Sequence, residues 1–264
     1  MGMVFEDRED AGRRLAAALP QFREQPDTVL LGLARGGIPV ASAAAEVLHL
    51  PYGAVLVRKL GIPGHDETAF GALAYAGAIA AEPGSAAGSE TSGAAAGLAN
   101  AAAGGGSAAS KAEATGTAAS ASDARRIVRL LNRPLVERIL EGGARQDWLD
   151  QVERRERDEL LRRVEAYPGA SLELSGKTVL LVDDGLATGA TMRAAVEAVR
   201  AAGASRVVAA APVGSIEAEK SLSRVCDVLC LHLPGRFRAV GSFYRHFEQL
   251  TDGDAIGLLQ GAHA

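Results

Sequence analysis

The chain has 264 residues, 48% of them apolar, and a formal net charge of −4 at pH 7. This length allows one large or two small domains. The negative balance excludes a general attraction to phosphate backbones, so we expect no nucleic-acid partner. No stretch reaches the roughly 18–20 apolar residues of a membrane span, and the first ten residues lack the apolar core of a signal peptide. We therefore expect a cytoplasmic protein with no membrane partner.

The two cysteines, Cys226 and Cys230, lie four residues apart in an apolar run. This setting favours small buried residues, and metal binding or a disulfide is the alternative.

The N-terminal region predicts a helix, a strand, a second helix and a second strand. Residues 1–20 form a leader helix, because apolar residues recur at helical spacing behind a capping residue, Asp7, and Pro20 ends the run. An unbroken apolar run at 28–33 predicts a buried strand. The next elements expected are a helix at 40–48 and a strand at 53–57.

The last third of the chain also alternates between strands and helices. A long charged helix at 146–167 precedes it, and we expect the charges of this helix on a solvated face. The elements that follow are strands at 178–182, 206–212 and 228–231 and helices at 190–201 and 216–224. This alternation is typical of an α/β fold, in which ligands bind at the carboxyl ends of parallel strands.

Between these regions, residues 81–122 consist mostly of alanine, glycine and serine, with one leucine and no aromatic residue. Such a composition cannot repay the entropy that ordering costs. We therefore predict a disordered, flexible insertion within a single domain that comprises residues 1–80 and 123–264.

The strongest local signal is VLLVDDGLATGAT at residues 179–191. An apolar strand leads to Asp183 and Asp184, and small residues then lead into a helix. Backbone N–H groups in such a turn, with the hydroxyl groups of Thr188 and Thr191, can surround a phosphate. Two adjacent carboxylates suit the hydroxyl pair of a ribose or the waters around Mg²⁺. The segment therefore predicts a site for a ribose phosphate.

Other phosphate loops fit this segment poorly. Ala190 stands where a Walker loop needs lysine, and the pattern G-x-G-x-x-G is absent. The segment instead resembles the signature of the type I phosphoribosyltransferases. The resemblance implies a parallel twisted sheet flanked by helices, with a small C-terminal hood at 232–264. It also implies that Asp183 and Asp184 are catalytic residues that hold the ribose hydroxyls and Mg²⁺. The residues implied to bind the 5-phosphate of phosphoribosyl pyrophosphate are Ala187, Thr188, Gly189, Ala190 and Thr191.

Two further segments resemble parts of the same family. LGLARGGIPV, at 31–40, is similar to the loop that binds the donor's pyrophosphate, which implies this role for Arg35, Gly36 and Gly37. VRKLGIPGHDE, at 57–67, resembles the flexible loop that closes over the active site, although a solvated hairpin would also explain it. Within that loop the resemblance makes Arg58 and Lys59 catalytic and assigns mobility to Gly61, Gly64, His65 and Glu67.

The acceptor of the phosphoribosyl group is harder to predict. Family members that act on 6-oxopurines carry aspartate where this chain has Ala187. Its absence argues against that subclass and leaves adenine, pyrimidine, orotate-like and other acceptors open. Aromatic and apolar side chains near the C-terminus could stack on a planar acceptor or pack on the core. These candidate hood residues are Phe237, Val240, Phe243 and Tyr244.

The sequence thus favours a Mg²⁺-dependent enzyme that transfers a 5-phosphoribosyl group from phosphoribosyl pyrophosphate to a nitrogenous small molecule and that could form a homodimer. A non-catalytic regulator that binds the same donor or a nucleotide is the main alternative. A sugar-phosphate hydrolase is a third possibility, for which no serine or cysteine has a convincing catalytic partner.

The low-complexity tract generates one prediction. Deletion of residues 80–122 should leave the melting temperature and donor binding almost unchanged, because flexible insertions at loops cost little. Thermal melting and calorimetry of the shortened chain measure both quantities. A large loss of either would show that the tract is part of the folded structure.

Overall fold

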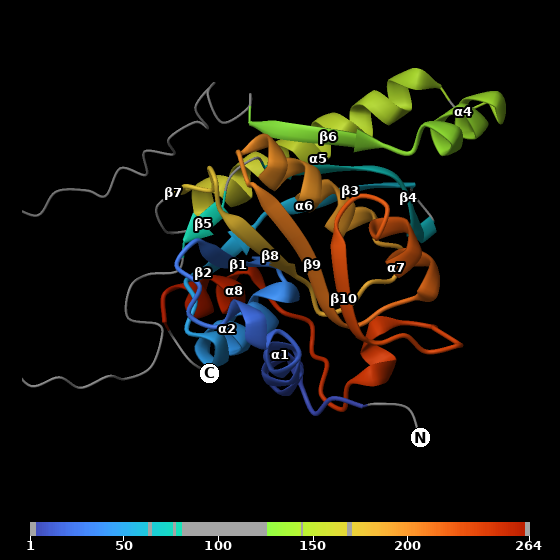
Figure 1. The fold of residues 1–264 in the computed structure, drawn as a ribbon. Helices are drawn as coiled ribbons and strands as arrows, with labels where there is room; N and C mark the ends of the chain where they lie inside the picture. The colour runs from blue at the N-terminus through green and yellow to red at the C-terminus, as the bar shows by residue number, and fades with distance from the viewer. Residues whose placement is uncertain are drawn as a thin grey trace, which may run out of the picture.

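The computed structural model describes residues 4–62, 65–75, 78–80, 126–143, 145–167 and 171–261. Within these ranges it contains a seven-stranded sheet and a three-stranded sheet with helices around both (Figure 1). The predicted α/β fold is confirmed. The predicted insertion at 81–122 lies outside the described residues.

The larger sheet has the strand order β10-β9-β8-β1-β2-β5-β7. Five neighbouring strands are parallel, and the last two pair antiparallel at one edge. The parallel strands are β1 (Thr28–Leu33), β2 (Tyr52–Val55), β8 (Thr178–Val182), β9 (Arg206–Val213) and β10 (Asp227–His232). The edge strands are β5 (Ala78–Ala80) and β7 (Ser171–Leu172). All six residues of β1 are buried, as its unbroken apolar run predicts for a central strand.

Helices cover both faces of this sheet. Leu30 and Leu180 belong to a core shared with α1 (Arg8–Ala17), α2 (Gly37–Leu48) and α8 (Asp252–Leu259). Their neighbours Leu31 and Leu181 belong to the opposite core, which includes α6 (Ala190–Ala201) and α7 (Ile216–Leu222). Successive strand residues face opposite sides of a sheet, so an unbroken apolar strand supplies both cores.

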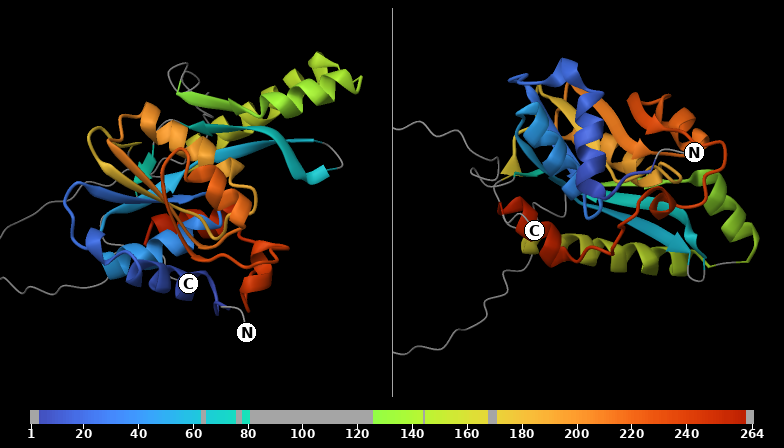
Figure 2. Two further views of the ribbon diagram at one scale, coloured as in Figure 1. Left: turned by 45° about the vertical axis from the view of Figure 1, so that its right-hand side comes forward. Right: turned by 90° about the horizontal axis from the view of Figure 1, so that it is seen from below.

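The smaller sheet has the order β3-β4-β6 and lies against the other side of α6. Its strands are β3 (Val57–Ile62), β4 (His65–Tyr75) and β6 (Ile127–Leu131), and α4 (Arg133–Glu141) follows β6. The long helix α5 (Gln146–Ala166) packs along β3 and β4 (Figure 2).

The segment predicted to be a flexible loop, 57–67, forms a hairpin of this second sheet where the structure describes it, and its mobility remains a prediction. Residues 57–62 and 65–67 belong to two antiparallel strands, with Ile62 opposite His65. Val57 and Leu60 are both buried, in different cores, and this alternation needs an extended backbone. Glu67 lies in β4, whereas Gly64 lies outside the described residues.

The segment before α1 lies against residues 243–245 beside the larger sheet. Asp7 caps α1, since its side chain accepts a hydrogen bond from the Asp10 N–H at 2.7 Å. The N–H of Phe5 donates to the carbonyl of Phe243 at 2.8 Å, and the N–H of Arg245 donates to the carbonyl of Phe5 at 2.9 Å. The turns between the larger elements include two 3₁₀ helices, Pro20–Phe22 and Val240–Phe243.

None of the helices in the described ranges has both the length and the apolar character needed to span a bilayer.

The close packing of α1 on α2 can be tested at Gly12. A Cβ atom at this position would lie 2.5 Å from the carbonyl oxygen of Val40 and 2.9 Å from the Cβ of Ala43. Gly12→Ala should therefore lower the free energy of unfolding by about 1–3 kcal/mol, although alanine is the better helix former. Chemical denaturation measures the change. The control is Arg13→Ala, which removes only an exposed ion pair with Glu9 and should have little effect.

Candidate functional site

Two turns emerge side by side from the middle of the larger sheet. Gly32 of β1 pairs with Val182 of β8, so the residues after both strands reach the same edge together. A Cβ atom on Gly36 would lie 2.1 Å from Oδ2 of Asp184, and one on Gly37 would lie 2.3 Å from the carbonyl oxygen of Val182. Gly36 and Gly37 therefore require glycine, because a side chain at either position would clash with the acidic turn, which contains Asp183 and Asp184.

The acidic turn presents two carboxylates in a half-buried setting. The side chain of Asp183 accepts a hydrogen bond from the N–H of Asp184 at 2.9 Å. Asp184 pairs with Arg8, whose Nε lies 3.0 Å from Oδ2. Burial, and then the neighbouring charge of Asp184, raise the pKa of Asp183 well above its ordinary value. Burial also raises the pKa of Asp184, although Arg8 opposes this shift.

The predicted phosphate turn leads directly into α6. Gly189 precedes the helix with a φ of +74°, a left-handed conformation that glycine adopts readily. Ser215 holds the start of the turn, because its hydroxyl donates to the carbonyl of Ala187 at 2.7 Å. Among the described residues, the N–H groups of Ala187, Thr188 and Gly189 donate to no protein acceptor. Free N–H groups at a helix N-terminus are suited to an anion.

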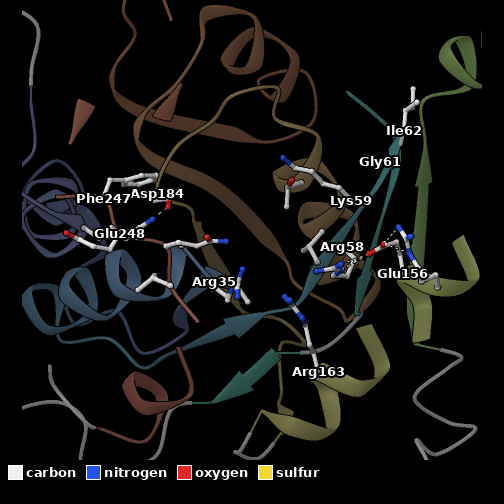
Figure 3. A pocket seen from close by; sticks show the side chains of 18 residues that line it. Arg35, Arg58, Lys59, Gly61, Ile62, Glu156, Arg163, Asp184, Phe247 and Glu248 are labelled. Carbon is white, nitrogen blue, oxygen red and sulfur yellow. Dashed lines mark hydrogen bonds and ion pairs between the residues drawn. The ribbon is translucent and has the colours of Figure 1, made fainter. Parts of the chain in front are cut away.

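A cleft of about 910 Å³ extends from these turns between the two sheets. In Figure 3, Asp184, Phe247 and Glu248 lie on one side of it and Arg58, Lys59 and Glu156 on the other. Cations outnumber anions along its walls. The cations are Arg8, Arg35, Arg58, Lys59, Arg155 and Arg163, and the anions are Glu156, Asp184 and Glu248.

The two cations predicted to be catalytic differ in their surroundings. Nε and Nη2 of Arg58 donate to Oε2 of Glu156 at 2.9 and 2.5 Å. Lys59 is exposed and lines both the cleft and a small cavity of about 160 Å³ at the acidic and phosphate turns. Lys59 is therefore available to a ligand, whereas Arg58 is already neutralised by the protein.

Helix α5 contributes residues that the sequence analysis placed on a solvated face. Glu156 and Arg163 are buried and line the cleft, so that expectation is wrong for them. Their positions carry a signal that could have revealed them. They fall on the same helical stripe as Leu149, Val152 and Leu160, and a charged residue on an apolar stripe indicates a buried contact.

The predicted hood residues have three different surroundings. Tyr244 is buried, and its hydroxyl donates to the carbonyl of Asp184 at 2.6 Å, so it packs on the core and supports the acidic turn. Val240 lies over Gly185 and lines the small cavity. Phe237 and Phe243 stack with ring centroids 5.8 Å apart. Of the four, Tyr244 is thus unavailable for stacking on an acceptor.

A separate cavity of about 740 Å³ borders the phosphate turn and the predicted hood. Ala187 and Thr188 form the part of its wall that belongs to the turn, and Arg236, Phe237 and Arg238 are lining residues from the predicted hood. The signature turn is therefore accessible from this cavity as well as from the cationic cleft.

In the described ranges, no group of three or more His, Cys, Asp or Glu side chains could hold a metal ion. Two carboxylates, such as those of Asp183 and Asp184, suffice for a cation that keeps water or ligand oxygens in its coordination shell, which is how Mg²⁺ usually binds.

These features would suit an anionic ligand that carries hydroxyl groups, and known proteins are similar to this chain in sequence and fold. Residues 132–235 match the family model of the phosphoribosyl transferase domain. Two Mycobacterium tuberculosis proteins, from strains CDC 1551 and H37Rv, are named as candidate phosphoribosyl transferases. Each is 34% identical over 264 residues, which cover 98% of this chain and 47% of the relative. The chain thus spans about half the length of these curated relatives.

One solved structure is similar to this protein along almost the whole chain. The crystal structure of TT1426 from Thermus thermophilus has 32% sequence identity and a TM-score of 0.62, and the match covers 97% of this chain and 98% of that one. The chain belongs to the phosphoribosyltransferase family.

The electrostatics of the acidic turn generate a stability prediction. Asp183→Asn should raise the free energy of unfolding at pH 7.5, because it removes a charge that the surroundings disfavour and keeps the oxygen that accepts the Asp184 N–H. A raised folded-state pKa means that the wild type loses stability as the pH rises above about 3.9, the unfolded value. The gain should therefore be smaller at pH 5.

Urea denaturation at both pH values measures this difference. The matched control is Asp227→Asn, since Asp227 is exposed and pairs only with Arg206 at the surface. A destabilised Asp183→Asn variant at pH 7.5 would contradict the prediction.

Proposed function

We propose that this protein transfers a 5-phosphoribosyl group from phosphoribosyl pyrophosphate to a nitrogenous small molecule and releases pyrophosphate, with Mg²⁺ as cofactor. The observation that carries the proposal is the contact between Gly36 and Asp184. It joins a pyrophosphate-type turn to a ribose-type acidic pair at the entrance to one cationic cleft. A cytoplasmic location and a homodimeric state, both expected from the sequence, remain predictions.

The dimensions and charges of the site support one orientation of the donor. The 5-phosphate would accept hydrogen bonds from the free N–H groups of the turn at Ala187, Thr188 and Gly189. The ribose hydroxyls would then face Asp183 and Asp184. The pyrophosphate would extend over the Arg-Gly-Gly turn into the cationic cleft.

Mg²⁺ fits the chemistry of the residues present. Asp183 and Asp184 would hold it together with waters and donor oxygens, and it would neutralise part of the charge on the pyrophosphate.

The reaction exchanges one bond at ribose C1 for another. The acceptor nitrogen forms a bond to C1, and the bond from C1 to the pyrophosphate oxygen breaks with its electron pair on that oxygen. Arg35 and Lys59 line the cleft where this negative charge would develop. Cations fixed in advance around a leaving group lower the barrier to its departure.

We place the acceptor in the cavity of about 740 Å³ beyond the phosphate turn. This cavity and the cationic cleft border the signature at different residues, Ala187 and Thr188 for the cavity and Asp184 and Thr191 for the cleft. The acceptor and the pyrophosphate could therefore approach the ribose from separate sides. Phe237 offers a ring for a planar acceptor, and Ala187 offers no acid or base for the proton of a 6-oxopurine.

One contact favours a non-catalytic regulator as the second candidate. Arg58, predicted to stabilise the leaving group, is occupied by Glu156, a carboxylate that is itself buried. A site with this pairing could bind the donor without releasing pyrophosphate.

The test is to incubate the purified chain with Mg²⁺, phosphoribosyl pyrophosphate and a panel of nucleobases and to measure pyrophosphate release. We expect release with at least one acceptor and none from the double variant Asp183→Asn/Asp184→Asn, which lacks the charges that hold Mg²⁺ and the ribose. Donor binding by wild type without release would favour the regulator.

Calorimetry with the donor and Mg²⁺ separates binding from turnover. The double variant should lose Mg²⁺-dependent binding while keeping its fold, and Asp227→Asn should bind as the wild type does. Unchanged affinity in the double variant would rule out this donor site.

A further inference from the structure

Arg8 occupies an unusual place for a cation. It is the first residue of α1, where the positive end of the helix dipole disfavours a positive side chain. Its side chain is nevertheless only 11% exposed. Contacts outside its own helix must therefore compensate for both the dipole and the loss of water.

Three contacts hold the guanidinium, and they come from two distant parts of the chain. Nε donates to Oδ2 of Asp184 at 3.0 Å, and Nη1 donates to the carbonyl of Glu248 at 3.0 Å. The Cζ atom lies 3.9 Å from the centroid of the Phe247 ring, within the range of a cation–π interaction. Figure 3 shows Asp184, Phe247 and Glu248 together on this side of the cleft.

These contacts determine which oxygen of Asp184 can meet a ligand. Oδ2 accepts a hydrogen bond from Arg8 and faces Gly36 more closely than Oδ1 does, since a Cβ built on Gly36 would lie 2.1 Å from Oδ2 and 3.1 Å from Oδ1. The backbone of Asp184 is fixed separately by the hydroxyl of Tyr244. With Oδ2 and the backbone both held, Oδ1 is the carboxylate oxygen left for a ligand.

Charge gives Arg8 a second effect. Asp183 and Asp184 place two adjacent carboxylates where a polyphosphate donor would lie, and like charges repel. In the described part of the chain, Arg8 is the cation that forms an ion pair with one of these two carboxylates, that of Asp184. It offsets this repulsion without occupying Oδ1.

We propose that Arg8 is a positioning residue for the donor: it orients Asp184 toward the ribose hydroxyls and makes donor affinity depend on the C-terminal segment at Phe247 and Glu248. This inference rests on the proposed function. Arg8 acts through Asp184 and takes no part in bond making.

The test measures affinity for phosphoribosyl pyrophosphate with Mg²⁺ by calorimetry in full-length variants. Arg8→Gln should weaken binding about tenfold or more. Arg8→Lys should bind the donor more tightly than Arg8→Gln but less tightly than the wild type. Lysine keeps the charge but lacks the planar guanidinium, which donates to both Asp184 and Glu248 and stacks on Phe247. Phe247→Leu should weaken binding by a smaller factor, since it removes only the stacking. If the protein turns over, KM for the donor should rise with little change in KM for the acceptor.

Arg14→Gln is the matched control. Arg14 lies on the same helix, with Nε 3.0 Å from Oδ1 of Asp10 and Cζ 5.5 Å from the Phe5 ring centroid, but it does not line the cleft. Its loss should leave donor affinity unchanged. Melting temperatures of all variants identify any that do not fold, and Arg8→Lys and Phe247→Leu then remain as the milder changes.

The outcomes distinguish the possible roles. Unchanged affinity in folded Arg8 variants, with a lower melting temperature, would make Arg8 a structural tether and overturn the inference. Tighter binding would make it a competitor of the donor and also overturn it. If the wild type binds no donor, the proposed function fails first, and the inference fails with it.

Discussion

The contact between Gly36 and the carboxylate of Asp184 is the constraint on which the rest of the site depends. It exists because β1 and β8 are neighbours in register, so that two turns far apart in sequence leave the sheet at one level. A side chain at Gly36 would clash with the carboxylate of Asp184, and two further groups hold Asp184 in this position. Arg8 approaches Asp184 from the start of α1, and Tyr244 supports its backbone. The glycine thus sets the distance between the two halves of the site.

Burial of charge is the recurring physical problem in this molecule. Two carboxylates with little exposure are each paired with a cation from a neighbouring element. Glu156 lies between Arg58 and Arg155, and Asp184 between Arg8 and Gly36. Asp183 forms no ion pair in the described ranges, and burial, followed by the charge of Asp184, raises its pKa. A buried charge without a partner lowers stability and is typical of a binding or catalytic group.

Much of the fold follows from local patterns. The strand at 178–182 and the helix at 190–201 have the bounds that the sequence predicts, because apolar runs and small-residue turns specify them within a few positions. The candidate site was predictable where it lies on such turns. The hairpin of β3 and β4 was harder to predict, since its alternation of buried and exposed residues is short and β6, the strand that pairs with β4, lies beyond residue 126. Its contacts with Glu156 could not be predicted, because no local rule brings two such distant segments together.

The pairing of segments that lie far apart in sequence has a consequence for how the protein is made. Arg8 reaches Asp184 across 176 positions and Glu248 across 240. A growing chain therefore synthesises Arg8 long before the carbonyl group that holds it. Closing so long a loop costs entropy that only the finished sheet can offset. The guanidinium that pairs with Asp184 is fixed only once Glu248 has been synthesised, so a nascent chain can carry the complete signature and still have an unfinished site.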